Sequence, residues 1–359
     1  MKKELVIFNP SIEDGGVEKN LFIISNYLCK KISEISIISS DIKKKKYFSD
    51  KINFISPIFF HSFGGRKIKY FFCIILLIIK IIRNRNLLVF SFQANIYAII
   101  VCYFFNINII SRSNTSASGW SKNYLKYRLF NFFLKKTKKV IVNSIDFKKE
   151  IDNKFKIKSE LILNPFDFKK IKELSKKKIK ERIFKSDFIK IINIGRMTDQ
   201  KDQLTLLKAF VIARKIRKIS LIILGKGKNY NLLKKFIEIN NISKYVHLLG
   251  YKDNPFPYIK LSDVFILTSK FEGSPNVLIE AQFLRKYIIS SNCPTGPREI
   301  LDNGNNGDLF RVGDYKELAN LIINYKKNNK KILRGYLSAK KYDLDKNCLK
   351  YYNLISKYL

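Results

Sequence analysis

The chain has 359 residues, 46% of them apolar, and 69 Lys and Arg against 29 Asp and Glu give a formal charge of +40. This length exceeds one ordinary core and suits two domains of about 150–180 residues, and the composition excludes a disordered chain. The charge favours anionic partners such as nucleic acid, lipid headgroups or phosphorylated ligands, although a Lys-, Ile-, Asn- and Phe-rich chain is also what an AT-rich genome encodes. Because basic residues are spread along the whole chain, a single nucleic-acid-binding stripe is not indicated.

The beginning of the chain and its cysteines bear on its location. Residues 5–8 form a strand-like segment directly after the first residues, so a signal peptide is not expected. The longest apolar run, residues 70–79, is shorter than the roughly 20 residues that a membrane-spanning helix needs, and it is expected to be a buried or interfacial helix. The cysteines form no Cys-x-x-Cys pair, which indicates neither a zinc site nor a disulfide framework and favours a reducing cytoplasm. They are Cys29, Cys73, Cys102, Cys293 and Cys348.

In the first half, short apolar segments alternate with longer helical stretches, which is typical of an α/β fold with a parallel sheet. Strands are expected at residues 5–8, 35–39, 87–91, 107–111, 140–143 and 161–163. Helices are expected between them, for example at residues 17–30, 66–83, 94–104 and 121–136.

The alternation stops at Asn164-Pro165, because proline restricts the residue before it. A basic segment with helical character follows at residues 168–185, and the domain junction is expected here. The first domain is predicted to comprise residues 1–166, completed by a C-terminal helix at residues 344–359. The second domain is predicted to comprise residues 167–343.

The second half restarts the same alternation. Strands are expected at residues 189–194, 221–224, 246–248, 264–267 and 288–290, and helices at residues 203–217, 230–240 and 275–283. The sequence therefore predicts an α/β architecture of two doubly wound, Rossmann-like domains that face each other across a cleft. Ligands bind such domains at the carboxyl ends of parallel strands.

Two glycine-containing turns follow strands in positions that suit a phosphate. Gly15-Gly16 lies between the first strand and the first helix, where a bare backbone and free N–H groups can approach an anion; the alternative is a plain βα turn. In the second half, Gly195 allows a tight exit from a strand, and Arg196 and Lys201 can converge on a diphosphate. The alternative for this pair is two solvated basic residues in a very basic protein.

The strongest candidate segment is residues 271–281. Ser274 is expected to be the N-cap of a helix whose first residue is Pro275, and the N-terminus of this helix would stabilise a phosphate. Glu272 precedes the helix and Glu280 lies on it, and carboxylates next to a phosphate site are suited to accept hydrogen bonds from sugar hydroxyls. The following loop, residues 293–300, adds Arg298 near the same place.

The spacing and order of these residues resemble the motifs of a known enzyme family. Glu272 and Glu280, with seven residues between them, resemble the signature of retaining GT-B glycosyltransferases of family four. The turn from Gly195 to Lys201 and the segments 224–227 and 249–251 resemble that family's neighbouring elements in the same order. The resemblance is dense from about residue 190 to residue 310 and looser in the first half.

The resemblance implies a role for each matching residue. Glu280 would bind the nucleotide ribose, Arg196 and Lys201 the diphosphate, and Glu272 hydroxyls of the transferred sugar. Catalysis would rest on Glu272, Arg196 and Lys201. The remaining donor-binding residues implied are Gly16 from the other domain, Gly195, Gly225 and Gly227 beside the nucleobase, and the backbone around Gly273, Ser274, Pro275 and Asn276.

One departure concerns the acceptor. Many relatives have a histidine near the position of residues 111–114, whereas this segment reads Ser-Arg-Ser-Asn, and Arg112 and Asn114 are the acceptor-side candidates. The two histidines are His61 and His247, and the latter is expected to be structural because it lies within a strand.

The resemblance predicts sugar transfer with retention from a nucleotide sugar, with UDP-hexose or UDP-N-acetylhexosamine favoured. The acceptor would be a glycan, carried by a lipid, in bacterial surface polysaccharide synthesis (O-antigen or capsule). No cofactor and no metal are expected, since the only Asp-x-Asp, residues 343–345, lies far from the other motifs. The alternatives are a GT-B sugar-nucleotide epimerase, for which no acid–base groups can be assigned, and a basic nucleic-acid-binding protein, which lacks the usual signatures. No nucleic-acid partner is therefore expected.

The expected cellular location of the protein rests on two segments that combine apolar residues with basic ones. Residues 66–85 and 122–133 combine apolar or aromatic residues with flanking Lys and Arg, which suggests peripheral contact with an anionic membrane surface on the cytoplasmic, inner face. The alternative is that both segments are amphipathic core helices.

Overall fold

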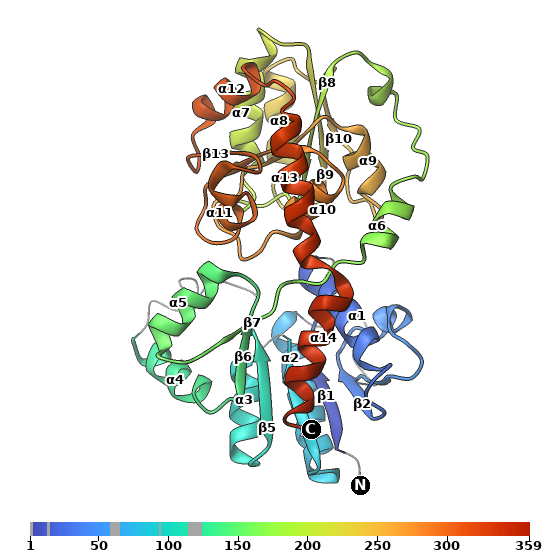
Figure 1. The fold of residues 1–359 in the computed structure, drawn as a ribbon, viewed down its shortest axis with the longest axis vertical. Coiled ribbons are helices and arrows are strands. Elements are labelled where there is room, and N and C mark those ends of the chain that lie inside the picture. Colours follow the sequence, from blue (N-terminus) through green and yellow to red (C-terminus); the bar gives the residue numbers. More distant parts are fainter. Residues whose placement is uncertain (1–2, 13–14, 58–64, 93–94, 114–123) are drawn as a thin grey trace. The chain divides into compact units, whose positions relative to one another are not determined.

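The computed structural model describes residues 3–12, 15–57, 65–92, 95–113 and 124–359. The chain divides into two compact units, coloured along the chain in Figure 1. Unit 1 comprises residues 1–166 and 344–359, and unit 2 comprises residues 167–343. The boundaries coincide with those expected from the sequence.

Unit 1 contains a seven-stranded parallel sheet with the order β3-β2-β1-β4-β5-β6-β7. The strands are β1 (Glu4–Phe8), β2 (Ile35–Ile38), β3 (Asn53–Ile55), β4 (Leu87–Ser91), β5 (Asn108–Arg112), β6 (Lys139–Val142) and β7 (Glu160–Leu161). The helices are α1 (Gly16–Leu28), α2 (Arg66–Arg83), α3 (Asn95–Phe104), α4 (Tyr124–Leu134), α5 (Ile145–Phe155) and α14 (Leu344–Ser356).

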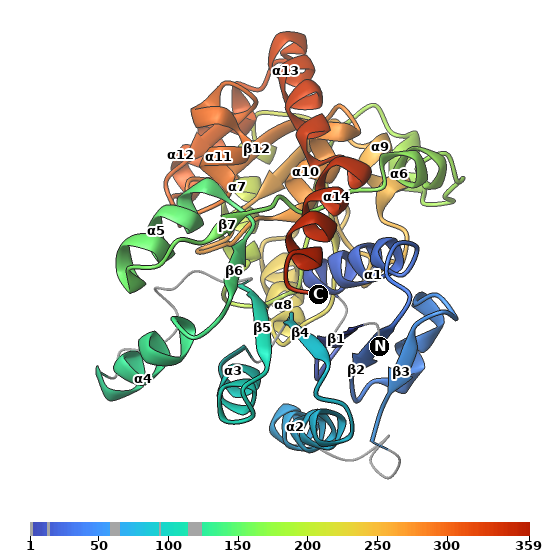
Figure 2. The same cartoon turned by 60° about the horizontal axis from the view of Figure 1, so that its bottom comes forward.

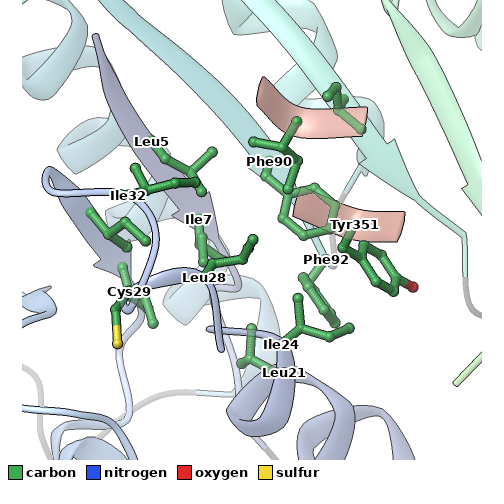
Figure 3. Close-up of a cluster of buried hydrophobic side chains, with 14 of the residues drawn as sticks. Leu5, Ile7, Leu21, Ile24, Leu28, Cys29, Ile32, Phe90, Phe92 and Tyr351 are labelled. Carbon is green, nitrogen blue, oxygen red and sulfur yellow. The ribbon is translucent and has the colours of Figure 1, made fainter. Parts of the chain in front are cut away.

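Side chains alternate across the sheet of unit 1, as the period of a strand requires. Leu5 and Ile7 of β1 belong to a core with α1 and α14, whereas Val6 and Phe8 belong to a second core with α2, α3 and α5. Figure 3 shows the first core, with Tyr351 of α14 next to Phe90 and Phe92. The C-terminal helix is therefore part of the first unit's interior.

Unit 2 contains a six-stranded parallel sheet with the order β10-β9-β8-β11-β12-β13. The strands are β8 (Ile189–Ile194), β9 (Ile219–Leu224), β10 (Val246–Leu248), β11 (Val264–Leu267), β12 (Tyr287–Ser291) and β13 (Asp308–Phe310). The helices are α6 (Phe168–Leu174), α7 (Gln203–Arg214), α8 (Tyr230–Ile239), α9 (Phe256–Leu261), α10 (Asn276–Phe283), α11 (Pro297–Ile300), α12 (Tyr315–Ile323) and α13 (Asn329–Ala339).

Unit 2 buries one continuous core between its sheet and the helices α7, α8 and α12. Leu206 and Phe210 of α7 contact this core from one side, and Ile191 and Ile266 contribute from neighbouring strands. On the opposite side, α10 packs against β12 and α13. Both faces of the sheet are covered, which is why its strands read as almost continuous apolar runs.

Some elements differ from the expectation. Strand β3 was not predicted, because it is short, begins with Asn53 and lies at the sheet edge. The helix expected over residues 168–185 ends at Leu174, and only a 3₁₀ turn (Arg182–Lys185) follows. The lysines at 176, 177, 178 and 180 would stack like charges one turn apart in a longer helix.

Candidate functional site in unit 2

The candidate site lies where the strand order of unit 2 reverses. Strand β8 pairs with β9 on one side and with β11 on the other, although β9 and β10 intervene in the chain. The loops after β8 and β11 therefore leave the same edge of the sheet side by side. They then diverge, one toward each face of the sheet. Doubly wound sheets bind ligands at such a switch point.

Lys201 and Glu272 meet at this switch point. Lys201 Nζ and Glu272 Oε1 form an ion pair, with 16% and 8% of the two side chains exposed. The hydroxyl of buried Ser269 donates to the same carboxylate oxygen at 2.5 Å. Thr268 Oγ1 donates to the backbone carbonyl of Lys201 at 2.9 Å. The two predicted residues are thus brought together and held by hydroxyls at the end of β11.

The loop after β9 lies directly on the loop after β8. Gly225 has a φ of +147°, and a Cβ there would lie 1.9 Å from the carbonyl oxygen of Gly195. A Cβ on Gly227 would lie 2.2 Å from the carbonyl oxygen of Met197. The Met197 N–H donates to the Lys226 carbonyl at 2.8 Å. Glycine is therefore required at both positions by the contact between the two loops.

A third loop fixes the backbone around Glu272. Gly296 has a φ of +83°, and a Cβ there would lie 2.5 Å from the Gly273 carbonyl oxygen and 2.7 Å from Cδ of Pro275. Thr295 Oγ1 donates to the carbonyl of Glu272. The segment that carries Glu272 is thus held from the β8 side by Lys201 and from the β12 side by this loop.

The helix after Glu272 begins one residue later than expected. Pro275 is itself the N-cap, with φ −70° and ψ 100°, and Ser274 does not cap the helix, so that prediction was wrong. The proline ring fixes φ near −65° in either conformation, and ψ decides where the helix starts. Asn276 and Glu280 are both buried and lie one turn apart on the same face of α10.

The other predicted residues of unit 2 lie on the same loops but are more accessible. Arg196 is exposed, and its backbone carbonyl accepts a 3.1 Å hydrogen bond from Gln203 Nε2. Arg298 is also exposed, and its Nε donates to Asn292 Oδ1 at 3.2 Å. The structure therefore joins Lys201 directly to Glu272 and leaves both arginines at the surface of the loops.

Cys293 and His247 are two titratable groups of unit 2 whose pKa values are shifted by burial. Burial, followed by the charge of Glu272, raises the pKa of the Cys293 thiol to about 12. This thiol stays protonated at neutral pH and cannot act as a thiolate nucleophile. His247 lies within β10, and burial lowers its pKa, which suits the structural role expected for it. Within the part of the chain that the structure describes, three or more His, Cys, Asp or Glu side chains do not gather as a metal site would require.

In unit 1, Arg112 is a buried interior group. Its Nε donates to Tyr351 Oη at 2.9 Å, its Nη2 donates to Asn164 Oδ1 at 2.7 Å, and its guanidinium lies over the Phe92 ring at 5.0 Å. Burial raises the pKa of Tyr351, so its hydroxyl keeps its proton. These contacts give Arg112 a structural function that its sequence position did not indicate.

Two further predicted residues are placed differently. Asn114 lies outside the described residues, as do His61 and the first two residues of the aromatic segment 122–133. Gly16 is the first residue of α1 and is exposed. Its expected contact with a donor remains a prediction.

Sequence reasoning missed Thr268, Ser269 and Thr295. The signal available was a pair of hydroxyl residues immediately after the apolar strand β11, which is where polar side chains reach the ligand edge of a parallel sheet. Their partners, Lys201 and Glu272, are supplied by tertiary contacts that spacing in the sequence does not reveal.

Comparison with known proteins identifies the domain that contains this site. Residues 175–342 match the family model of glycosyl transferases group 1. The chain therefore contains a group 1 glycosyltransferase domain, which includes Arg196, Lys201, Glu272 and Glu280.

The sequence is similar to several curated glycosyltransferases. It is 38% identical over 179 residues to an uncharacterized glycosyltransferase of Methanocaldococcus jannaschii, covering 48% of this chain and 44% of that protein. It is 26% identical over 245 residues to the N-acetylgalactosamine-N,N'-diacetylbacillosaminyl-diphospho-undecaprenol 4-alpha-N-acetylgalactosaminyltransferase of Campylobacter jejuni, covering 65% of each. It is 29% identical over 174 residues to the UDP-Gal:alpha-D-GlcNAc-diphosphoundecaprenol alpha-1,3-galactosyltransferase of Escherichia coli, covering 46% of this chain and 45% of that protein. The matches thus span less than two thirds of each of these relatives.

The fold is similar over almost the whole chain to solved structures. The structure of HepE from Anabaena in complex with UDP matches with a TM-score of 0.79 at 16% identity, covering 99% of this chain and 100% of that one. A glycosyltransferase of Rickettsia africae matches with a TM-score of 0.79 at 18% identity, covering 99% and 98%. The fold of the chain is the GT-B fold, with two Rossmann-like domains, as the sequence predicted.

Proposed function

We propose that this chain, which contains a group 1 glycosyltransferase domain at residues 175–342, transfers a sugar from a nucleotide-sugar donor to a glycan acceptor. The donor is a UDP-hexose or a UDP-N-acetylhexosamine, and the acceptor is carried by a lipid during synthesis of a bacterial surface polysaccharide. The transfer retains the configuration of the sugar.

The observation that carries this proposal is the meeting of Lys201 and Glu272 at the switch point of unit 2. A diphosphate beside Lys201 and Arg196 would have its charge balanced, and backbone N–H groups at the start of α10 would add favourable dipoles. Glu272, ahead of the helix, would accept hydrogen bonds from the sugar, and Glu280, on the helix, from the ribose.

The relatives support the choice of donor and acceptor. Two have names that include a diphospho-undecaprenol acceptor, and one of these has a UDP-galactose donor. Structures with this fold have been solved with UDP and with UDP-glucose. A lipid-linked acceptor would require the enzyme to work at the inner face of a cell membrane.

In the proposed reaction, the bond between sugar C1 and the β-phosphate oxygen breaks while the acceptor oxygen forms its bond to C1 on the same face. The acceptor proton passes to the leaving diphosphate. Two carboxylates flanking the bond, as in retaining glycosidases, do not fit, because Glu272 already accepts from Lys201 and Ser269 and Glu280 is buried in α10. The chain itself contributes positioning and charge stabilisation by Lys201 and Arg196.

The test is a screen of the purified full chain against UDP-, GDP- and ADP-sugars, with binding measured calorimetrically. UDP and one UDP-sugar are expected to bind. Lys201→Ala should weaken UDP binding by about ten- to a hundredfold, since charged hydrogen bonds contribute about 1.5–3 kcal/mol. The matched control is Lys215→Ala, an exposed lysine at the end of α7, which should leave UDP binding unchanged.

Two outcomes would overturn the proposal. One is that no nucleotide or nucleotide sugar binds to the folded wild-type chain. The other is that Lys201→Ala and Lys215→Ala bind UDP equally well. Retention is checked separately by the NMR coupling constant at the anomeric carbon of the product, and an inverted product would overturn that part alone.

A further inference from the structure

Three helices of unit 1 form one outer layer over the same face of its sheet. Helices α2, α3 and α4 contact one another in that order, and Figure 2 shows them in a row along one side of the sheet. Their inner faces contribute Cys73, Cys102 and Leu134 to one core. Their outer faces are available for a different contact.

The outer face of α2 is apolar along its whole length. Its exposed apolar residues recur at i, i+3, i+7, i+11 and i+14, which is one continuous stripe on a helix. The buried residues Cys73, Leu77 and Ile81 lie on the other side. A helix that covers a soluble core is expected to be polar outside, yet this second apolar stripe does not belong to the core that the described residues of unit 1 form. It consists of Ile68, Phe71, Ile75, Ile79 and Ile82.

The same surface continues over α3 and α4 with exposed aromatic rings. Tyr103 packs edge-on against Phe132, with ring centroids 5.9 Å apart. Lys136 Nζ lies over both rings, at 5.6 Å and 5.0 Å. Aromatic rings next to lysine are the composition found where a protein meets the headgroup region of a bilayer. The exposed apolar residues here are Tyr97, Tyr103, Phe104, Leu129 and Phe132.

The charged residues of α2 itself and of the three residues after it are all basic. Residues 66–86 contain six basic residues and no acidic residue. Lys69 and Lys80 turn inward, where they pair with Asp41 and Glu4 at 2.6 Å and 2.8 Å. Lys67 and Arg83 are exposed near the two ends of the stripe and on either side of it. The stripe is thus bordered by basic groups.

We propose that this outer face of α2, α3 and α4, the membrane face, docks on an anionic lipid bilayer. The apolar residues would enter the headgroup boundary while Lys67, Arg83 and Lys136 contact lipid phosphates, with the helices lying along the surface. Within the described residues, no helix is both long enough and apolar enough to cross a bilayer. The biological meaning of this surface rests on the proposed function, since a lipid-linked acceptor lies in the membrane.

A second copy of the chain fits this face less well. In a two-fold symmetric contact the same patch meets itself, so Lys67 and Arg83 would oppose other basic groups rather than acidic ones. An anionic bilayer supplies both the apolar layer and the opposite charge. Charge complementarity therefore favours lipid.

The first test is flotation of the wild-type chain with vesicles made of phosphatidylglycerol and phosphatidylcholine in equal parts, without any nucleotide. Phe71→Ser combined with Ile82→Ser changes two residues that are 60% and 61% exposed. It should reduce partitioning at least about a hundredfold, from the loss of apolar burial. The matched control is Leu232→Ser combined with Ile239→Ser on α8, where the residues are 51% and 67% exposed. This control should bind like the wild type.

The second test separates charge from apolar contact. Lys67→Glu combined with Arg83→Glu should weaken binding by about tenfold or more, since each basic group near such a surface contributes about one factor of five. Lys326→Glu combined with Lys330→Glu changes the net charge equally at exposed positions of unit 2 and should have a much smaller effect. Raising the ionic strength from about 0.1 M to about 1 M, which shortens the screening length from about 10 Å to about 3 Å, should weaken binding by the wild type.

The proposal is overturned if the wild type does not float with anionic vesicles, or if each variant behaves like its control. It is also overturned if light scattering detects a wild-type dimer that Phe71→Ser with Ile82→Ser dissociates, because the face then belongs to a second copy. UDP binding by the same variants should be unchanged. Loss of vesicle binding with intact UDP binding, and the reverse, distinguish a failure here from a failure of the proposed reaction.

Discussion

The ammonium of Lys201 and the carboxylate of Glu272 form an ion pair across the switch point of the second sheet. The lysine follows β8 and the glutamate follows β11, so 71 positions of the chain separate them. Each group offsets the other's charge in a largely buried place. A diphosphate that uses Lys201 must therefore compete with Glu272.

This competition predicts the direction in which Glu272→Gln changes UDP affinity. Removing the negative charge makes Lys201 more available, so UDP affinity should stay the same or rise a few-fold. Sugar transfer should fall at least about a hundredfold, because the amide accepts hydrogen bonds from sugar hydroxyls less strongly. Calorimetry with UDP and a transfer assay measure the two quantities, with exposed Glu238→Gln on α8 as the control. A tenfold loss of UDP affinity in folded Glu272→Gln would contradict the assignment.

Glu280→Gln, in contrast to Glu272→Gln, should weaken the binding of UDP. If the buried carboxylate of α10 binds the ribose, the variant should lose about ten- to a hundredfold affinity for both UDP and the UDP-sugar, the equivalent of about 1.5–3 kcal/mol. The same calorimetric titrations measure it, with circular dichroism as the check on folding. Equal UDP affinities for Glu280→Gln and the wild type would rule out the ribose contact.

Gly225→Ala should destabilise unit 2 more than Gly250→Ala does. Both glycines have positive φ, and an alanine costs about 1–2 kcal/mol at the +69° of Gly250, in the left-handed region, and about 1–3 kcal/mol at the +147° of Gly225, which lies outside it. Only at Gly225 would the new Cβ meet another loop, at the Gly195 carbonyl, whereas nothing lies within 4 Å at Gly250. The extra cost should be about 1–3 kcal/mol, measured by urea unfolding, and UDP binding should fall with it. Equal destabilisation by both alanines would argue against close contact of the loops.

Tyr351→Phe should destabilise unit 1 by about 1–3 kcal/mol, because it removes the oxygen that accepts from buried Arg112. Tyr352→Phe, at the next position and half-buried, is the control and should change the free energy of unfolding by less than about 0.5 kcal/mol. Urea unfolding of both variants decides this. If the control loses as much stability as Tyr351→Phe, the hydrogen bond to Arg112 is not the cause.

Activity with the preferred UDP-sugar should survive a chelator. The motive is the sequence, in which the only Asp-x-Asp, residues 343–345, lies between the 3₁₀ turn Lys340–Tyr342 and α14 rather than at a strand end. Rates measured with and without EDTA test the prediction. Complete loss of activity that manganese restores would show that the reaction needs a divalent ion.

Four strands, β4, β8, β10 and β11, begin and end where expected. Three of them lie inside the sheets, where a strand covered on both faces reads as an apolar run with polar ends. The fourth, β10, lies at a sheet edge. The edge strand β3 lacks that signal. The loop residues Lys201 and Glu272 could be predicted as members of one site, because strand-end motifs in a doubly wound sheet converge.

What the sequence did not reveal depends on distant partners. Arg112 was an acceptor-side candidate, yet its guanidinium is buried and donates to Tyr351, 239 positions away. Ser269 was not predicted as a site residue, yet it donates to Glu272. In both cases the deciding contact is tertiary, and local spacing contains no information about it.

The position of α14 determines when unit 1 can finish folding during synthesis. Its residues Cys348, Tyr351 and Ile355 belong to the same core as Leu5 and Ile7 from the first strand, and Figure 3 shows Tyr351 in that core. A ribosome that has just translated residue 166 has made only part of that core. At about 5–20 residues per second, the missing helix is completed roughly ten to forty seconds later, after all of unit 2. During that interval the apolar surface around Phe90 and Phe92 lacks its cover, so the nascent chain presents a binding site for chaperones while the second unit, continuous in the chain, can already fold.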